Sequence, residues 1–127
     1  MGQYLIDNSI ISKFFSNSYN TTASLFIATI IDEVPNISVI TKIEALSWLN
    51  SDKAKERAVR EFIQHANILF LSPNIADRCI ALRRSRSIKT PDAIIAATAL
   101  VYDLVLITSD AGFSRITELK VIDPENM

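Results

Sequence analysis

The sequence has few of the residues that break or cross-link a chain. Its 127 residues include one cysteine, two glycines and four prolines. A single cysteine excludes an internal disulfide, and so few turn-forming residues are untypical of an all-β sandwich. Disorder is excluded as well, because 49% of the residues are hydrophobic. A chain of this length and composition is expected to form one compact domain over residues 1–127.

Long apolar runs and targeting signals are scarce too. The longest run, 93–107, is interrupted by Asp103 and is shorter than the roughly 20 apolar residues that a membrane-spanning helix needs. No signal-peptide pattern opens the chain, since the short apolar run 4–6 is followed at once by Asp7. We therefore expect a cytoplasmic protein with no membrane segment.

Charge of one sign is not in excess, because the formal net charge is −1. The field of the whole molecule therefore gives no general attraction to nucleic acid, and any such binding has to be local. One basic stretch contains no acid and directly precedes the motif TPDAIIAATAL. It either contacts phosphate groups or forms a solvated helix end that complements its own dipole. Its cationic residues are Arg83, Arg84, Arg86 and Lys89.

Short β-branched or apolar runs alternate with helical stretches along the chain. Strands are expected at 3–6, 36–40, 68–71 and 104–108, with a weaker fifth at 120–122. Helices are expected at 10–15, 22–33, 41–49, 52–66, 74–86 and 91–102, with a short helical turn near 113–118. The strand runs are continuously apolar, which is typical of strands covered on both faces. The pattern predicts an α/β fold with a central parallel sheet of four to five strands flanked by helices.

Acidic residues follow the predicted strands. In an open α/β sheet, ligands bind beyond the carboxyl ends of the strands, where the strand order reverses. Asp7 follows the first strand and Asp110 the fourth, while Glu44 lies about one turn into the helix after the second. Asp92 lies in the first turn of the alanine-rich helix, for which Thr90 is the expected N-cap. These four carboxylates are predicted to meet at one edge of the sheet.

Four carboxylates at one place need a compensating charge. The repulsion between two like unit charges about 4 Å apart costs about 4 kcal/mol at an effective dielectric near 20. Hard divalent cations prefer oxygen ligands, so Mg²⁺ or Mn²⁺ is the expected cofactor, and such ions suit phosphoryl chemistry. The one histidine and one cysteine offer no zinc-binding spacing, and the two isolated glycines form no phosphate-binding loop.

Each acid also has a purely structural interpretation. Asp7 could be a turn residue or a helix cap, and Glu44 could occupy the exposed position of an amphipathic helix. Asp92 could be only a helix-start charge, and Asp110 only a turn acid before Gly112. The shared location of the four acids favours the metal site.

Four blocks of the sequence, in this order, resemble the PIN-domain family, and most closely the VapC-type toxins of prokaryotic toxin–antitoxin pairs: YLIDNSIIS, ISVITKIEALSWL, KTPDAIIAATALVYDLVLITSDAGFSRI and VIDP. The resemblance spans nearly the whole chain. It implies a small α/β fold and an Mg²⁺- or Mn²⁺-dependent ribonuclease site made of Asp7, Glu44, Asp92 and Asp110. It also implies a cognate antitoxin whose C-terminal peptide blocks the site, and a tendency to form homodimers.

The chain departs from the family pattern at two positions. Asn8 stands where relatives usually have Thr or Ser, although Ser9 could hold the Asp7 carboxylate or a metal-bound water. Gly112 stands where many relatives have a further acid, which we interpret as the loss of an accessory group. Asn8, Ser9 and Thr108 are the expected supporting residues of the site.

The working hypothesis is that Asp7, Asp92 and Asp110 ligate one divalent ion, with Glu44 joining directly or through water. The bound water would attack a phosphodiester of single-stranded RNA, and the basic stretch would contact its phosphates. One alternative is a PIN-like module that binds or scaffolds without catalysis. Another is a phospho-receiver-like domain, which would require an acidic pair after the first strand and an Asp closing a middle strand.

Four other conspicuous residues are interpreted as structural. Trp48 and Phe62 fall at helical core spacing and are expected to pack rather than to stack on bases. Cys79 is expected to be a small core residue, and His65 a partner for the C-terminal end of its helix.

Overall fold

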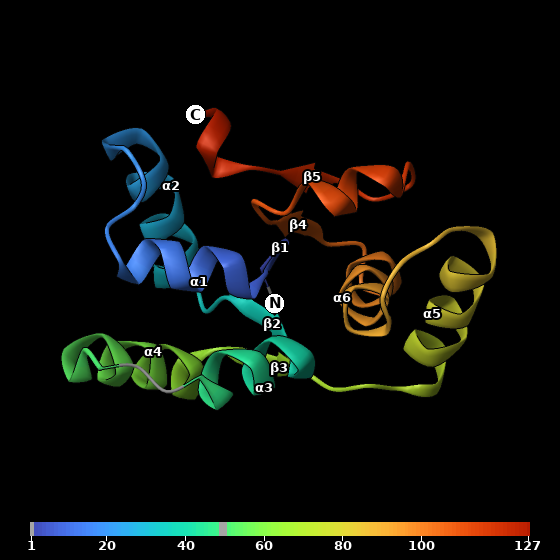
Figure 1. The fold of residues 1–127 in the computed structure, drawn as a ribbon, viewed down its shortest axis with the longest axis horizontal. Helices are drawn as coiled ribbons and strands as arrows, with labels where there is room; N and C mark the ends of the chain where they lie inside the picture. Colours follow the sequence, from blue (N-terminus) through green and yellow to red (C-terminus); the bar gives the residue numbers. More distant parts are fainter. Residues whose placement is uncertain (1, 49–50) are drawn as a thin grey trace.

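The computed structural model describes residues 2–48 and 51–127, and strands alternate with helices along it (Figure 1). The strands are β1 (Tyr4–Ile6), β2 (Asn36–Ser38), β3 (Asn67–Leu69), β4 (Val105–Ile107) and β5 (Val121–Ile122). The α-helices are α1 (Asn8–Phe15), α2 (Thr21–Asp32), α3 (Val39–Ser47), α4 (Lys53–His65), α5 (Pro73–Ser85) and α6 (Thr90–Val101). Two short 3₁₀ helices follow, η1 (Ala111–Arg115) and η2 (Pro124–Asn126).

All paired strands of the sheet run parallel, in the order β3-β2-β1-β4-β5. The predicted α/β fold class is confirmed. The chain winds outward from β1 through β2 to β3 and then returns to the other side of β1 with β4 and β5. The reversal of strand order therefore lies between β1 and β4, where Ile6 pairs with Ile107. The residues that follow these two strands emerge side by side at this point.

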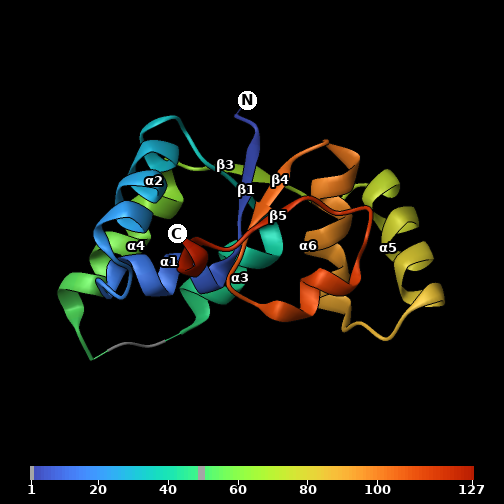
Figure 2. The same ribbon diagram turned by 90° about the horizontal axis from the view of Figure 1, so that it is seen from above.

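The sheet is covered on both faces, which explains why β1 and β4 are apolar throughout. Leu5 and Leu106 belong to one buried cluster, which also contains the alanines of α6. Their neighbours Ile6 and Ile107 belong to a second cluster, as expected from the alternation of side chains along a strand. Figure 2 shows α1, α2 and α4 on one side of the strands and α5 and α6 on the other.

Several element boundaries differ from those expected. β2 ends at Ser38 rather than at residue 40, because the Ser38 hydroxyl accepts a hydrogen bond from the Ile40 backbone N–H (3.1 Å) and caps α3. β3 begins at Asn67 and ends at Leu69, two residues before its predicted end. The predicted last residue of α3, 49, lies outside the described residues. The helical turn predicted at 113–118 is the 3₁₀ helix η1, which begins two residues earlier.

The predicted N-cap of α6 is wrong by one residue. Lys89 has extended backbone and its carbonyl accepts the first helical hydrogen bond, from the Ala93 N–H at 2.9 Å. Thr90 is therefore the first residue of the helix, and no side chain caps it. Asp92 still lies in the first turn, so its interaction with the helix dipole is unaffected by this correction.

The structural interpretations hold for Phe62 and Cys79, which are both buried, but not for Trp48. Trp48 is 60% exposed and lies under the Lys55 ammonium, 5.3 Å from its ring centroid. The reason is that α3 ends at Ser47, one residue before Trp48. The backbone of Trp48 is extended, so the helical spacing on which the prediction rested does not apply to it. His65 is the last residue of α4, and its Nδ1 lies 2.8 Å from the Glu61 carbonyl oxygen.

Candidate active site

Asp7 is the most firmly held of the four acids. It is 7% exposed and caps α1, with Oδ1 accepting a hydrogen bond from the Asn8 backbone N–H at 2.8 Å. Oδ2 accepts hydrogen bonds from the hydroxyls of Thr108 (2.8 Å) and Ser9 (3.1 Å). Three donors therefore fix this carboxylate, which is a helix cap and a member of the acidic cluster at once.

The hydroxyls around Asp7 also fix the segment after β4. The Ser9 hydroxyl accepts a hydrogen bond from the Ser109 backbone N–H at 3.3 Å, and the Thr108 hydroxyl accepts one from the Asp110 N–H at 3.1 Å. The same two side chains thus hold the Asp7 carboxylate and the backbone of Asp110. This network joins the ends of β1 and β4 at the reversal of strand order.

Glu44 and Asp92 lie within electrostatic reach of the other acids. Partial burial raises the pKa of the Glu44 carboxyl, and the charges of Asp7 and Asp92 raise it further. Partial burial also raises the pKa of the Asp92 carboxyl, as do the charges of Asp110 and Asp7, while Lys89 opposes the shift. The mutual effects bring all four predicted carboxylates into one negatively charged cluster.

Asp110 is exposed and also fits its structural interpretation. Its Oδ1 accepts a hydrogen bond from the Gly112 backbone N–H at 2.9 Å and so caps η1. Across residues 2–48 and 51–127, no three acidic, histidine or cysteine side chains are placed to hold a metal ion. The acids thus share one region, but their carboxylates stand farther apart than the ligands of a bound ion.

The structure divides the basic stretch that the sequence treats as one. Arg83 and Lys89 line a cavity of about 400 Å³ together with Asp92. Arg84 is not among the residues of its wall, and Arg86 forms an ion pair with Glu118 (3.3 Å) instead.

A further cation on the wall of this cavity, Arg115 in η1, was missed by the sequence reasoning. Its place in the chain, five residues after Asp110, is the signal that could have found it, because η1 is too short to carry Arg115 far from the acid that caps it.

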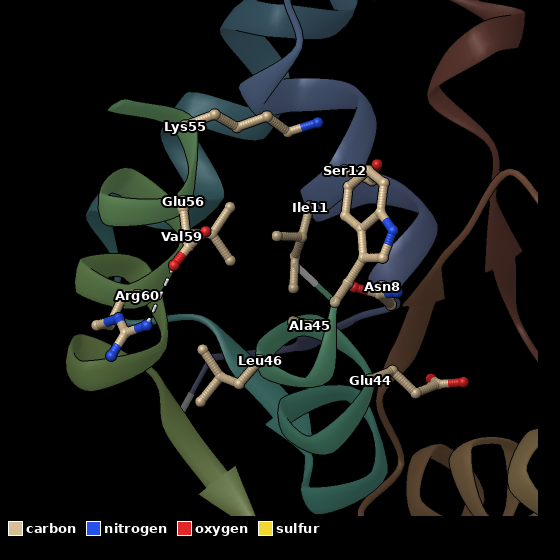
Figure 3. Close-up of a pocket in the computed structure, with 11 residues that line it drawn as sticks. Asn8, Ile11, Ser12, Glu44, Ala45, Leu46, Lys55, Glu56, Val59 and Arg60 are labelled. Atoms are coloured by element: carbon tan, nitrogen blue, oxygen red, sulfur yellow. Dashed lines mark ion pairs between the residues drawn. The ribbon is translucent and has the colours of Figure 1, made fainter. Parts of the chain in front are cut away.

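A second cavity, of about 430 Å³, opens between α1, α3 and α4 (Figure 3). Leu46 and Glu44 leave α3 in different directions, with Leu46 turned toward α4 and Glu44 away from it. Arg60 on the wall forms an ion pair with Glu56 (3.5 Å). Glu44 thus stands both at the edge of this cavity and in the acidic cluster.

Comparison with known proteins decides the family. The family model described as PIN domain matches residues 4–119. The chain belongs to the PIN domain family. No curated protein matches the chain by sequence. This membership excludes the phospho-receiver alternative, and the chain indeed has no acid at the end of β3, where Leu69 is followed by Phe70.

Solved structures of toxin–antitoxin complexes are similar to this PIN domain over nearly its whole length. A toxin–antitoxin complex from Klebsiella pneumoniae is 31% identical, with a TM-score of 0.72 over 95% of this chain and 97% of that one. VapBC-1 from nontypeable Haemophilus influenzae is 25% identical, with a TM-score of 0.72 over 95% and 97%. DNA-bound VapBC from Salmonella typhimurium shares the fold at 22% identity, with a TM-score of 0.77 over 98% and 99%.

The helices of this PIN domain are short. Among the described residues, none of them combines the length and the apolar character that crossing a bilayer needs.

Proposed function

We propose that this PIN domain is a metal-dependent endoribonuclease, the toxin of a type II toxin–antitoxin pair, which hydrolyses phosphodiester bonds of RNA at its acidic cluster. The observation that carries the proposal is the position of the cluster. Asp7, Glu44, Asp92 and Asp110 converge where the strand order reverses, the place at which open α/β sheets bind ligands.

The donor chemistry of the cluster fits Mg²⁺ or Mn²⁺. Every candidate ligand is a carboxylate oxygen, which is what hard divalent cations prefer. The pKa values of Glu44 and Asp92 are raised first by partial burial and then by the charges of neighbouring acids, and a cation would relieve that repulsion. Because the carboxylates stand apart, binding would require the exposed side chains of Glu44 and Asp110 to turn inward. When bound, such an ion supplies an activated water and stabilises the leaving oxygen.

The chain's own residues would have separate roles in binding the substrate and in catalysis. Asp7, held by three donors, offers a carboxylate in a fixed orientation. Glu44, whose carboxyl has a raised pKa, can accept a proton on its carboxylate more readily than an ordinary glutamate. Arg83 and Lys89 stand beside Asp92 and are suited to contact phosphates of the substrate.

We also propose an antitoxin as partner, from the Klebsiella and Haemophilus complexes to which the chain is similar. The cavity between α1, α3 and α4 has Glu44 at its edge (Figure 3), so a peptide lying in it would cover one of the four acids. We further propose that the toxin forms homodimers and acts in the cytoplasm, where its RNA substrate would be met.

Controlled expression in a bacterial host tests the toxin role. We expect expression of the wild-type chain to stop growth and expression of Asp92→Asn at the same protein level to permit it. Equal growth arrest by both proteins would show that the arrest does not depend on the acidic cluster, and no arrest by the wild type would contradict the toxin role.

Titration calorimetry with Mn²⁺ tests the metal site separately. The wild type should release or absorb binding heat that Asp92→Asn lacks. The absence of Mn²⁺ heat from the wild type, or the same heat from the variant, would remove the metal from the proposal.

A further inference from the structure

We propose that the cavity whose wall contains Arg83, Lys89 and Arg115 is a phosphate subsite, which binds the RNA phosphate adjacent to the one that is cut. The assignment rests on the proposed ribonuclease function. Asp92 belongs to the wall of this cavity and also to the acidic cluster, so the two sites share a boundary. An RNA strand whose scissile phosphate reaches the acids would place a neighbouring phosphate at this cavity.

The three cations are available to an anion. Among the described residues, no acid forms an ion pair with Arg83, Lys89 or Arg115, whereas nearby Arg86 is paired with Glu118. Arg83 donates a hydrogen bond from Nε to the Ile88 carbonyl oxygen (3.2 Å). This bond orients the guanidinium and leaves both terminal nitrogens available to an anion. Arginine terminal nitrogens form paired hydrogen bonds with phosphate oxygens.

The charge balance of the wall favours an anion. Three cations face a single carboxylate, Asp92, and the wall also contains Gly112. Gly112 adds no charge to this wall, whereas an acid there would add a second negative charge.

The start of α6 adds to this field. No side chain caps the helix, so its first N–H groups keep their partial positive charge at the end where Lys89 and Asp92 line the cavity. This contribution is secondary to the side-chain cations. Together these features make the cavity positively charged next to a negatively charged cluster, which suits a polyanion that reaches a metal held by the acids.

Cleavage kinetics test the assignment against a matched control. Arg83→Gln, Lys89→Gln and Arg115→Gln remove cations from the wall, while Arg84→Gln removes one from the same helix end outside it. All four residues are exposed, so the variants should fold like the wild type. We expect the three wall variants to raise KM several-fold with little change in kcat, and Arg84→Gln to change neither. Equal kinetics for Arg115→Gln and Arg84→Gln would overturn the subsite.

Substrate length gives a sharper form of the same test. A dinucleotide has a single phosphodiester, so no second phosphate lies beside the one that is cut. A trinucleotide has a second phosphate next to the scissile one. The defect of Arg115→Gln should appear on the trinucleotide and disappear on the dinucleotide. A defect of the same size on both would place Arg115 at the scissile phosphate and overturn the proposal.

Binding in EDTA separates failure of the subsite from failure of the proposed function. The affinity of a labelled single-stranded RNA is measured at several salt concentrations, and each wall variant should reduce the slope of log K against log salt by about 0.7. If the wild type does not cleave RNA, the ribonuclease proposal fails, and the slopes still decide whether the cavity binds RNA phosphate. If the wall variants show the same salt slope as Arg84→Gln, the phosphate subsite is overturned and the proposed ribonuclease function is not.

Inorganic phosphate serves as a second probe, because a free anion and an RNA phosphate share the same chemistry. It should compete with RNA on the wild type and lose that effect in Arg115→Gln. Binding of phosphate that depends on Arg115, combined with RNA binding that does not, would make the cavity a site for a free anion and overturn its assignment to RNA.

Discussion

Thr108 donates a hydrogen bond from its buried hydroxyl to Oδ2 of Asp7 at 2.8 Å, so the residue that follows β4 orients the carboxylate that follows β1. These two strands flank the point where the strand order reverses. Ser9 donates to the same oxygen at 3.1 Å. The Asp7 carboxylate is thus positioned from α1 and from the end of β4, which fixes one member of the acidic cluster before any ion or substrate arrives.

Removing the Thr108 hydroxyl should loosen the site. Thr108→Val keeps the side-chain shape and deletes a hydrogen bond to a charged group, which is worth about 1.5–3 kcal/mol of unfolding free energy. Cleavage should fall roughly 10–100-fold, as is usual when a group that orients a metal ligand is lost. Urea unfolding and RNA cleavage rates measure the two effects, and Thr108→Ser should restore most of both.

Thr98→Val is the matched control for this prediction. Its hydroxyl is equally buried but donates to the Ile94 carbonyl oxygen within α6, at 2.7 Å. Thr98→Val should therefore leave the cleavage rate unchanged. Full activity in Thr108→Val would show that Asp7 does not need this donor.

The acidic cluster should destabilise the metal-free fold at neutral pH. Because the pKa of Glu44 is raised in the folded protein, this carboxyl binds its proton more tightly there than in the unfolded chain, and its ionisation costs stability as pH rises. Glu44→Gln should therefore unfold at a slightly higher temperature than the wild type at pH 7, by roughly 0.5 kcal/mol or less in unfolding free energy. The difference should vanish below the ordinary pKa of glutamate.

Thermal unfolding of the wild type and Glu44→Gln in EDTA, at neutral and acidic pH, tests which of the two proteins is more stable. Addition of Mn²⁺ at pH 7 should reverse the order of stability, because the ion stabilises only the chain that binds it fully. A wild type more stable than Glu44→Gln at pH 7 without metal would contradict a raised pKa of Glu44 in the folded protein.

Gly112 offers a test of charge in the wall of the phosphate subsite. A Cβ at this position would lie 3.2 Å from Oδ1 of Asp110, so any side chain there crowds the acid to a similar degree. Gly112→Asp and Gly112→Asn therefore share the steric effect and differ in charge. RNA affinity in EDTA should be several-fold weaker for Gly112→Asp than for Gly112→Asn. The same affinity for both would argue against an anion site.

The proposed homodimer has a candidate contact beside β3, one of the two edge strands. Phe70 is 63% exposed directly after this strand, and Leu71 follows it. Analytical ultracentrifugation should show a dimer for the wild type and a monomer for Phe70→Ser, with Leu25→Ser on α2 as an exposed apolar control that stays dimeric. A monomeric wild type would contradict the proposal.

The parts of the fold that could be predicted from the sequence follow from local patterns of residues. β1 and β4 are short apolar runs, Asp7 comes directly after the first and Asp110 soon after the second, so their common edge followed from the parallel sheet. Trp48 could not be placed, because its exposure depends on where α3 ends, within one residue.

Contacts between distant segments escaped the sequence reasoning. The hydrogen bond from the Thr108 hydroxyl to Asp7 joins residues 101 positions apart, and no local pattern encodes it, whereas the bond from Ser9 to Asp7 spans only two positions. Arg115 and Arg83 line the same cavity from η1 and α5, which only the folded chain brings together. Sequence also could not separate Arg83 from Arg86, since the ion pair with Glu118 decides their difference.

Cleavage of a mixed RNA pool by the purified chain, free of any antitoxin, is the decisive experiment for the proposed ribonuclease activity. The reactions contain Mg²⁺ or Mn²⁺, with EDTA and the Asp92→Asn variant as controls. We expect discrete cuts that disappear in both controls. No cutting by the wild type with either ion, or equal cutting by the variant, would contradict that activity and favour a PIN domain that binds without catalysis.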